Sequence, residues 1–599
     1  MEKRTLLAVV LSVVVISGGY LVQGWLFPTT PAVNTAIPMQ STETVNQIGN
    51  SPGTSIEKHA ETQLMAKPIA SSDQVEPLPV FEEKVVVSTD LVKVVLSNRG
   101  GDIVSYKLLE HKDGDDQVEM ILSGDTETHA FTIAFGGIDA RPINDFFHVK
   151  RVSERVVEFY RDFSLLQPNA TQATNFRLTK RYDFKPGEYL FELSVTLDAG
   201  FASGSVDFDG NAYTLGFGPQ IGPKFAKLTQ NYEYRRYYSY SAGKRKTEKV
   251  TVKAPTIISS QVSWAAIAGK YFTFIAIPDA TNYTMSFSST PVAGIPETSK
   301  LYIGRPPLKS SKATDTYRFY LGPKTSKALS IYNSTDKNSY KLRETNLSAV
   351  VDTSGILGPL ETGMKWFLMI FYQVIPNYGV AIILLTILVK LIMFPLTKKG
   401  SESTIRMQAL SPKIKEIQDK FKDNPNKMNV EMAELYKKEG YNPLSGCLPM
   451  LLQIPIFFAM YNLFNNHFDL RGAMFIPGWI PDLSIPESIW SFAPFQIPFL
   501  GWSNLRLLPF LYLGSQLMYG KVTQTPDQQN NSQMKMMLYM MPIVFFFVLY
   551  DVPAGLLLYW IMSNLLTMVQ QLTINKYLAK KKMQMAHVTG PVIAPRRKK

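Results

Sequence analysis

Cysteine is almost absent from this chain, in which Cys447 stands alone among 599 residues. A single cysteine excludes an intrachain disulfide and any metal site built from several cysteines, so an exported part of the chain has to be stabilised by its apolar core. Histidine is also scarce, because six are scattered along the sequence and none forms the HExxH pattern of a zinc protease. With no catalytic residues, cofactor site or metal site visible, we predict that the protein is not an enzyme.

A phosphate-binding loop is missing as well. The glycine-rich segment Leu215–Pro223 lacks the GxxxxGK[ST] spacing, and we interpret it as a turn. Aspartate and glutamate are missing from six long apolar segments, which removes the intramembrane carboxylates of an ion-coupled transporter. These segments are Thr5–Phe27, Pro376–Leu396, Gly446–Asn465, Ser503–Gly520, Met536–Tyr550 and Val552–Thr573.

Apolar sequence is abundant, at 45% of the residues, and it is combined with a net charge of +13. The positive residues collect beside the apolar segments, which favours a lipid neighbour over a nucleic acid. The 21 residues from Pro376 to Leu396 form a helix of about 31 Å, which matches the bilayer core. The sequence therefore predicts a multi-pass α-helical membrane protein with six spans.

The first apolar segment predicts an N-terminal anchor over residues 1–27. It follows Lys3 and Arg4 and ends without a small-x-small cleavage site, so we expect it to stay uncleaved. Residues 28–80 are rich in Thr, Ser, Pro, Gln and Glu without periodicity. Such a composition buries too little apolar area to offset the ordering entropy, and it predicts a flexible linker.

Residues 81–345 predict an inserted all-β sandwich domain. After the Pro186-Gly187 turn, apolar side chains alternate with smaller or polar ones, as in a strand with one buried face. Another predicted pair, Val92–Leu96 and Ile103–Leu108, flanks a turn that contains Gly100 and Gly101. Few helical patterns separate these strands, which favours an antiparallel sandwich.

The remaining segments predict helices and a tail. Residues 352–375 include an apolar, aromatic stretch that stops at Pro376, and we interpret it as an interfacial helix along the membrane. Residues 401–440 contain two helical patterns separated at Asn424-Pro425, a charged hairpin whose apolar positions pack its two helices together. Residues 576–599 form a basic tail beyond the last span.

The distribution of positive charge orients the chain. Residues 398–438 carry ten Lys or Arg and residues 576–599 carry eight without Asp or Glu, whereas the only Lys or Arg among residues 466–501 is Arg471. Both termini are therefore expected in the cytoplasm, with the β-domain outside, between the first and second spans. This layout implies the inner membrane of a bacterium with a periplasm.

Lys390 is a charged residue inside a predicted span, six residues before Leu396 and so about 9 Å from the end of that helix. Its stem can carry the ammonium to the cytoplasmic interface, and this snorkelling is one interpretation. Polar positions on the same span and on neighbouring spans favour a functional interpretation. They are Thr386, Gln453, Asn462, Tyr559, Ser563, Thr567 and Gln570. Such faces turn toward each other as hydrogen-bonded contacts or as the lining of a wet cavity, and both remain open.

Several motifs occur in one order along the membrane half, with two more in the exported half. They are Leu388–Thr397, Asn442–Pro449, Gln453–Phe457, Met541-Pro542, Pro553–Trp560, Ser563-Asn564, Trp264–Pro278 and Tyr320–Lys324. Together they resemble the YidC/Oxa/Alb membrane protein insertase family, in its Gram-negative YidC type with a large periplasmic domain. The resemblance implies a five-helix core with a cytoplasm-open hydrophilic groove inside the inner leaflet.

The resemblance also implies an activity and a set of partners. The protein would assist insertion, folding and assembly of inner-membrane proteins, alone or with the Sec translocon. Nascent membrane proteins, the lipid bilayer and a ribosome bound through the basic tail and cytoplasmic loops are the expected partners, with no specific nucleic-acid sequence. Groove and client-binding residues would be Lys390, Thr386, Gln453, Tyr559, Trp560 and Ser563.

One position departs from the family pattern, because the groove cation is usually arginine and Lys390 stands there in this sequence. Lysine keeps the charge and loses the planar five-donor fork, so we expect attraction for an acidic client segment without bidentate binding. Two alternatives from other classes remain. One is a solute channel or transporter with a periplasmic binding domain, and the other is an envelope-polysaccharide enzyme whose acidic residues, distant in sequence, meet in the exported domain.

Overall fold

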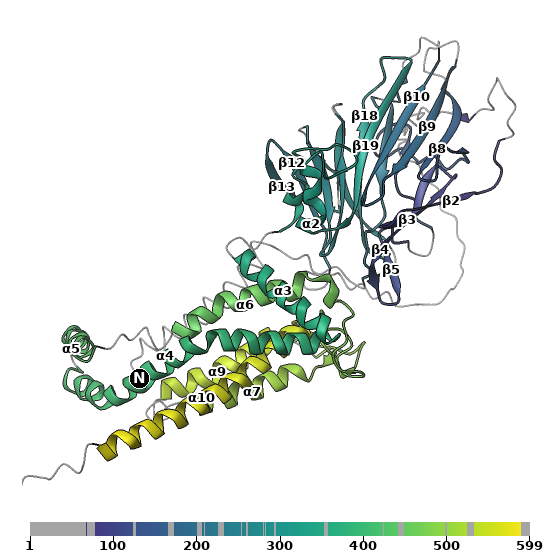
Figure 1. Cartoon of the computed structure of the whole chain (residues 1–599). Coiled ribbons are helices and arrows are strands. Elements are labelled where there is room, and N and C mark those ends of the chain that lie inside the picture. The colour runs from purple at the N-terminus through teal and green to yellow at the C-terminus, as the bar shows by residue number, and fades with distance from the viewer. Residues whose placement is uncertain are drawn as a thin grey trace, which may run out of the picture. The chain divides into compact units, whose positions relative to one another are not determined.

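The computed structural model describes residues 67–588 with internal gaps (Figure 1). The gaps are residues 69–77, 124–126, 166–172, 201–205, 209, 226–232, 253, 259–260, 280, 282, 293–294, 353–356, 423, 441–447, 498–499 and 524–531. The predicted N-terminal anchor and most of the predicted linker therefore lie outside the described residues.

The first half of the chain is a β-domain in which every strand pairing is antiparallel. A ten-stranded sheet has the order β1-β8-β9-β10-β19-β16-β15-β12-β13, with β7 paired to β8. A five-stranded sheet has the order β14-β17-β18-β11-β6, and a four-stranded sheet has the order β2-β3-β4-β5. Their bounds are β1 (Lys67–Pro68), β2 (Lys84–Ser88), β3 (Val92–Ser97), β4 (Asp102–Asp113), β5 (Asp116–Glu119), β6 (Thr132–Ala134), β7 (His148–Arg151), β8 (Val156–Leu165), β9 (Thr174–Phe184), β10 (Leu190–Asp198), β11 (Tyr213–Phe217), β12 (Arg236–Ser241), β13 (Lys244–Glu248), β14 (Thr256–Ile258), β15 (Trp264–Ala268), β16 (Phe272–Ile277), β17 (Thr284–Val292), β18 (Ile295–Arg305) and β19 (Lys312–Pro323).

Local sequence explains these strands as predicted. Buried and partly exposed residues alternate along most of β10 because successive side chains of a strand point to opposite faces. The turn before β10 uses Gly187 at φ +71°, and the turn between β3 and β4 uses Gly100 and Gly101 at φ +69° and +61°. A Cβ on Gly100 would lie 2.5 Å from the Asp102 carboxylate, so both backbone angle and space require glycine there.

Aromatic residues fill the space between the sheets. Phe217 of the five-stranded sheet stacks on Phe274 of the ten-stranded sheet, with ring centroids 3.9 Å apart, and Phe131 lies 4.6 Å from Phe319. The same core contains a buried ion pair, in which the Lys180 ammonium lies 2.5 Å from the Asp102 carboxylate. After β19 the chain forms α2 (Ser326–Ser330) and the short 3-10 helices η1 (Ile331–Asn333) and η2 (Leu347–Val350).

The second half of the chain is helical. Its elements are α3 (Gly358–Val374), α4 (Tyr378–Lys420), α5 (Pro425–Lys438), α6 (Leu448–Asn466), η5 (Phe468–Leu470), the two-stranded β20 (Trp490–Ser491) and β21 (Asn504–Leu505), α7 (Leu508–Thr523), α9 (Ser532–Val548) and α10 (Ala554–Val588). Figure 1 shows α4, α7, α9 and α10 running side by side. A separate apolar core is formed by buried residues of α3, α4, α6, α7 and α10.

Two helices continue past the predicted boundaries in the helical half. The span from Pro376 to Leu396 and the first arm of the cytoplasmic hairpin form one helix, α4, whose 43 residues continue past Pro395 and Pro412. At the helical rise this is about 65 Å, longer than a bilayer core, so α4 extends well beyond a membrane. Likewise α10 continues to Val588, through half of the segment predicted as a basic tail.

Smaller differences follow from local interactions. The segment predicted as a span from Ser503 begins as a strand, because Ser491 and Asn504 pair in β20 and β21, and α7 starts only at Leu508. Residues Leu215–Phe217, predicted as part of a turn, belong to β11. Lys67-Pro68, inside the predicted flexible linker, pair with β8. The hairpin break is confirmed, since the Asn424 side chain caps α5 by accepting from the Lys427 N–H.

Length and composition identify one helical segment in the described part of the chain that can cross a membrane, Tyr378–Gly400. Tyr539–Val548 is a shorter apolar helix. Helices α6, α7, α9 and α10 overlap the other predicted spans after residue 376. The count of six spans and the interfacial position of α3 stay predictions.

Candidate functional site

The predicted polar residues lie on faces of α4, α6 and α10. On α4, Thr386 is fully buried, and its hydroxyl donates a hydrogen bond to the Ile382 carbonyl one turn back, over 2.7 Å. Lys390 lies one turn further and is 9% exposed. The two residues therefore share one inward face of α4, as their spacing predicted.

The last helix meets this face at Lys390. Gln570 of α10 donates a hydrogen bond from Nε2 to the Lys390 carbonyl oxygen over 3.2 Å. Its own Oε1 is buried without a partner among the described residues. No described carboxylate lies within ion-pair distance of the Lys390 ammonium, whereas the buried lysine of the β-domain, Lys180, is paired with Asp102. The site thus contains a nearly buried cation and an unsatisfied acceptor.

A second polar contact joins α6 to α10. Gln453 donates from Nε2 to the Tyr559 hydroxyl over 3.0 Å, and the Tyr559 side chain is fully buried. Ser563 is also buried, one turn along α10 from Tyr559. The structure therefore brings the predicted residues of three helices into the interior of the helical half.

Trp560 has an apolar setting. Its ring stacks on Phe457 of α6, with centroids 4.8 Å apart and planes 4° apart, and lies 5.5 Å from the Tyr512 ring of α7. These contacts place Trp560 in a cluster of aromatic side chains between α6, α7 and α10, next to Tyr559 in the sequence. A client-binding role for Trp560 stays a prediction.

Some polar contacts were missed from the sequence. Asn564 of α10 donates to the Ser515 hydroxyl over 3.0 Å and to Gln516 Oε1 over 2.8 Å, which joins α10 to α7. The signal was available, since Ser515 and Gln516 interrupt an apolar run opposite a helix that carries a polar stripe. Asn462, predicted with Gln453, instead lines a different cavity.

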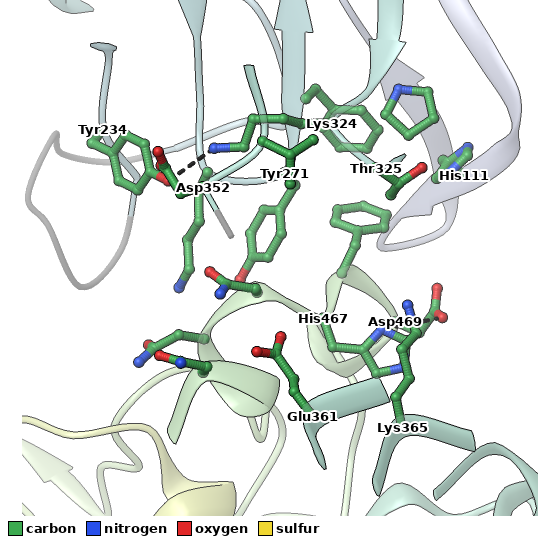
Figure 2. Close-up of a pocket in the computed structure, with 18 of the residues that line it drawn as sticks. His111, Tyr234, Tyr271, Lys324, Thr325, Asp352, Glu361, Lys365, His467 and Asp469 are labelled. Atoms are coloured by element: carbon green, nitrogen blue, oxygen red, sulfur yellow. Dashed lines mark hydrogen bonds and ion pairs between the residues drawn. The ribbon is translucent and has the colours of Figure 1, made fainter. Parts of the chain in front are cut away.

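That cavity has a volume of about 450 Å³ and is lined largely by polar and charged side chains (Figure 2). Figure 2 shows Lys324 hydrogen-bonded to the Tyr234 hydroxyl, a contact of 2.9 Å, with Glu361, Lys365, His467 and Asp469 also facing the cavity. Burial lowers the pKa of Lys324 to about 8. Burial likewise lowers the pKa of Lys270, another lining residue, to about 8. Neither lysine was identified from the sequence.

No described group of three or more His, Cys, Asp or Glu side chains has metal-site geometry. The predicted polar residues of α4, α6 and α10 are amides, hydroxyls and one amine, which can solvate a polar segment or attract an acid. The arrangement suits binding and transfer of a polar chain segment.

Comparison with known proteins covers both halves. A family model described as 60Kd inner membrane protein matches residues 370–582, and one described as YidC periplasmic domain matches residues 84–361. A protein of Treponema denticola named membrane protein insertase YidC is 44% identical over 590 residues, with 97% of this chain and 100% of that protein covered. The protein of the same name from Treponema pallidum is 39% identical over 633 residues, with 97% and 100% covered.

A solved structure described as an active YidC insertase with its first transmembrane domain resolved is also similar. It is 17% identical, and the alignment covers 85% of this chain and 94% of that chain with a TM-score of 0.32. The similarity to the curated relatives extends across both the β-domain and the helical half.

Proposed function

The chain belongs to the YidC family of membrane protein insertases, and from this membership we propose how its helical half moves client proteins into the bilayer. Family membership makes it an inner-membrane insertase with a periplasmic domain. The relatives named above are insertases, so a solute channel is not supported. In our proposal a hydrophilic groove between α4, α6 and α10, open to the cytoplasm, receives the polar flank of a client.

The observation that supports this groove is the setting of Lys390. Its side chain is 9% exposed, no described carboxylate pairs with it, and it shares the inward face of α4 with Thr386. A cation in that setting is costly and attracts a negative charge more strongly than one in water. An acidic client segment entering the groove would supply that charge.

Partition of the client into lipid supplies the driving force, without a catalytic step. Each large apolar residue contributes about −0.3 to −0.6 kcal/mol at the centre of a span, so one client helix supplies several kcal/mol. The obstacle is desolvation of the polar flank. Hydrogen-bonding groups at Thr386, Gln453, Tyr559 and Ser563 would lower this cost. The apolar segment would then leave past Trp560 into lipid.

The topology belongs to the same proposal. Six spans, an uncleaved first span and cytoplasmic termini would place the β-domain in the periplasm, α5 in the cytoplasm and residues 466–507 outside. The charge difference between residues 398–438 and residues 466–501 supports this orientation. The Sec translocon is the proposed partner for larger clients. The ribosome would bind near α5 and the basic end of the chain, where positive residues can attract ribosomal RNA.

Site-specific photocrosslinking tests the groove. A photoreactive side chain at Ser563, which is buried on α10, is expected to crosslink the hydrophilic flank of a nascent client. The matched control is Leu565, two residues away on the same helix and 38% exposed, which should crosslink lipid or the client's apolar segment. Equal crosslinking of the hydrophilic flank from both positions would contradict a groove on the inward face.

A further inference from the structure

The loop between α6 and α7 changes character at Glu487. Charged residues precede this point, including Asp469, Arg471 and Asp482, and charge resumes only at Arg506. Residues 488–505 between them contain no Asp, Glu, Lys or Arg, and they include Trp490, Trp502 and three phenylalanines. A charge-free aromatic stretch is unusual for a loop facing water.

The described part of this stretch forms a β-hairpin that is held in place by contacts to neighbouring helices. β20 pairs with β21, and the Ile497 N–H donates to the Trp502 carbonyl over 2.8 Å. Near its turn the Trp502 ring stacks on Tyr550, with centroids 3.5 Å apart, and the Tyr550 hydroxyl donates to the Asn504 carbonyl over 2.9 Å. The hairpin is thus fixed to the end of α9.

A second set of contacts fixes the base of the hairpin to the turn after α9 and to the start of α7. Arg506 donates to the Tyr550 carbonyl and forms an ion pair with Asp551. The Glu487 carboxylate accepts from the Leu508 N–H, at the start of α7, over 2.7 Å. Charge is therefore confined to the base, where it is paired or caps a helix, and the projecting part is apolar.

The projecting side chains are exposed. Trp490 is 65% exposed and Phe495 is 63% exposed, and Ile489, Ile497 and Leu500 are exposed as well. The patch continues onto the neighbouring helix ends, where Phe510 and Leu511 of α7 and Phe547 and Val548 of α9 are also exposed. A group of exposed apolar side chains of this size favours an apolar partner.

We propose that this hairpin inserts into the extracytoplasmic leaflet of the bilayer and anchors the outer ends of α7 and α9. Three features favour lipid as the occupant. The patch continues the exposed apolar faces of helices that belong to a membrane protein. Its aromatic residues suit the bilayer interface, with Ser491, Ser503 and Asn504 at the wetter base. It carries no cation for an anionic headgroup and no charge for a polar partner. The proposal rests on the chain being a membrane protein and does not depend on the Lys390 groove.

Spin labelling of the full chain measures the depth of the hairpin. In a Cys447→Ser background, a nitroxide is placed at Phe495→Cys, at the hairpin-base position Ser488→Cys, or at Lys246→Cys, on an exposed β-domain strand. Each variant is reconstituted into vesicles of phosphatidylethanolamine and phosphatidylglycerol. Collision rates with oxygen, which concentrates in lipid, and with a water-soluble nickel chelate are then compared.

The label at Phe495 is expected to collide more with oxygen and less with nickel than the label at Lys246, with Ser488 between them. Nickel accessibility at Phe495 equal to that at Lys246 would overturn the proposal. Protection that develops only after a client peptide is added would make the hairpin a client-binding surface, and spin–spin broadening between Phe495 labels would make it an interface between copies. Either result would also overturn insertion into lipid.

Discussion

Gln570 donates a hydrogen bond to the backbone carbonyl of Lys390 over 3.2 Å, which ties α10 to α4 through the main chain and not through charge. Lys390 lies close to a place where the hydrogen bonding of α4 is interrupted. Pro395 has no N–H to donate to the Leu391 carbonyl one turn back, so the helix is locally open beside Lys390. The Lys390 ammonium takes no part in this contact.

The topology makes a direct labelling prediction. With Cys447 replaced by serine, a cysteine at the exposed position Ser330 is expected to react with an impermeant thiol reagent added from the periplasmic side. The positive-inside distribution is the reason. Labelling from the cytoplasmic side alone, or a mature protein that begins after Gly24, would show that the proposed topology is wrong.

The Gln453–Tyr559 contact predicts coupled losses of stability. Tyr559→Phe and Gln453→Leu each remove one hydrogen bond between α6 and α10, and each should cost about 0.5–1.5 kcal/mol. Because both changes break the same bond, the double variant should lose less than the sum of the two single variants. Thermal midpoints in detergent measure this, with Tyr512→Phe as the control on α7. Additive losses would mean that the contact contributes nothing.

The buried pair of the β-domain predicts a larger effect. Lys180 is fully buried and lies 2.5 Å from the Asp102 carboxylate. Lys180→Met leaves that carboxylate buried with only the His129 ring, 3.2 Å away, as a side-chain partner, so the free energy of unfolding of the β-domain should fall by about 3–5 kcal/mol. The control is Arg177→Met, which breaks an exposed ion pair with Asp162 and should cost about 0–1 kcal/mol. Proteolysis of the β-domain at increasing urea concentration compares them, and equal sensitivity would contradict the prediction.

Lys324 predicts a pH dependence with a definite sign. Burial lowers the pKa of Lys324 in the folded protein to about 8, from 10.5 for the unperturbed side chain. Between these values the unfolded chain binds the proton that the folded chain releases, so this group makes stability rise with pH from about 8 to 10.5. Below pH 8 its contribution is constant and unfavourable.

The Lys324→Met variant should lack this rise. Thermal midpoints of the parent protein and the variant are compared between pH 7.5 and 9.5, where the difference is expected to shift in favour of the parent as pH increases. Lys246→Met, at a largely exposed lysine, is the control and should follow the parent. A difference that stays constant with pH would show that Lys324 does not titrate in this window.

The sequence predicted most of the elements because their causes are local. Alternation along β10, the glycines at positions 100 and 101, and the capping residue Asn424 each act within a few residues. Helix lengths were harder, since the predicted span and the first arm of the hairpin form one helix, α4, that contains Pro395 and Pro412. Neighbouring helices can support a proline inside a span, and that support depends on tertiary contacts that no local pattern contains.

The candidate site was partly predictable for the same reason. Spacing alone places Thr386 and Lys390 on one helical face, as found. It cannot identify which helix faces them, so Gln570 was recognised as part of a polar stripe and not as a neighbour of Lys390. For Arg506 the predicted position itself was inaccurate. It falls inside the predicted span Ser503–Gly520, but it lies before α7, where it pairs with Asp551.

Substitutions at Lys390 separate the two interpretations of this residue. If attraction of acidic segments is its role, Lys390→Arg should retain insertion, Lys390→Ala should impair clients with acidic flanks, and Lys390→Glu should be worst because it repels them. Two unit charges about 8 Å apart interact by about 2 kcal/mol at an effective dielectric constant of 20, which corresponds to roughly 30-fold in rate. A snorkelling anchor predicts instead that Lys390→Ala is tolerated by every client.

The central measurement is the rate at which two clients are inserted, one with an acidic and one with a neutral hydrophilic flank. The parent protein and the Lys390→Ala variant are compared at equal abundance in the membrane. The groove-charge account predicts a large loss for the acidic client and a small one for the neutral client. Equal rates for Lys390→Ala and the parent on both clients would contradict it and leave Lys390 as a membrane anchor.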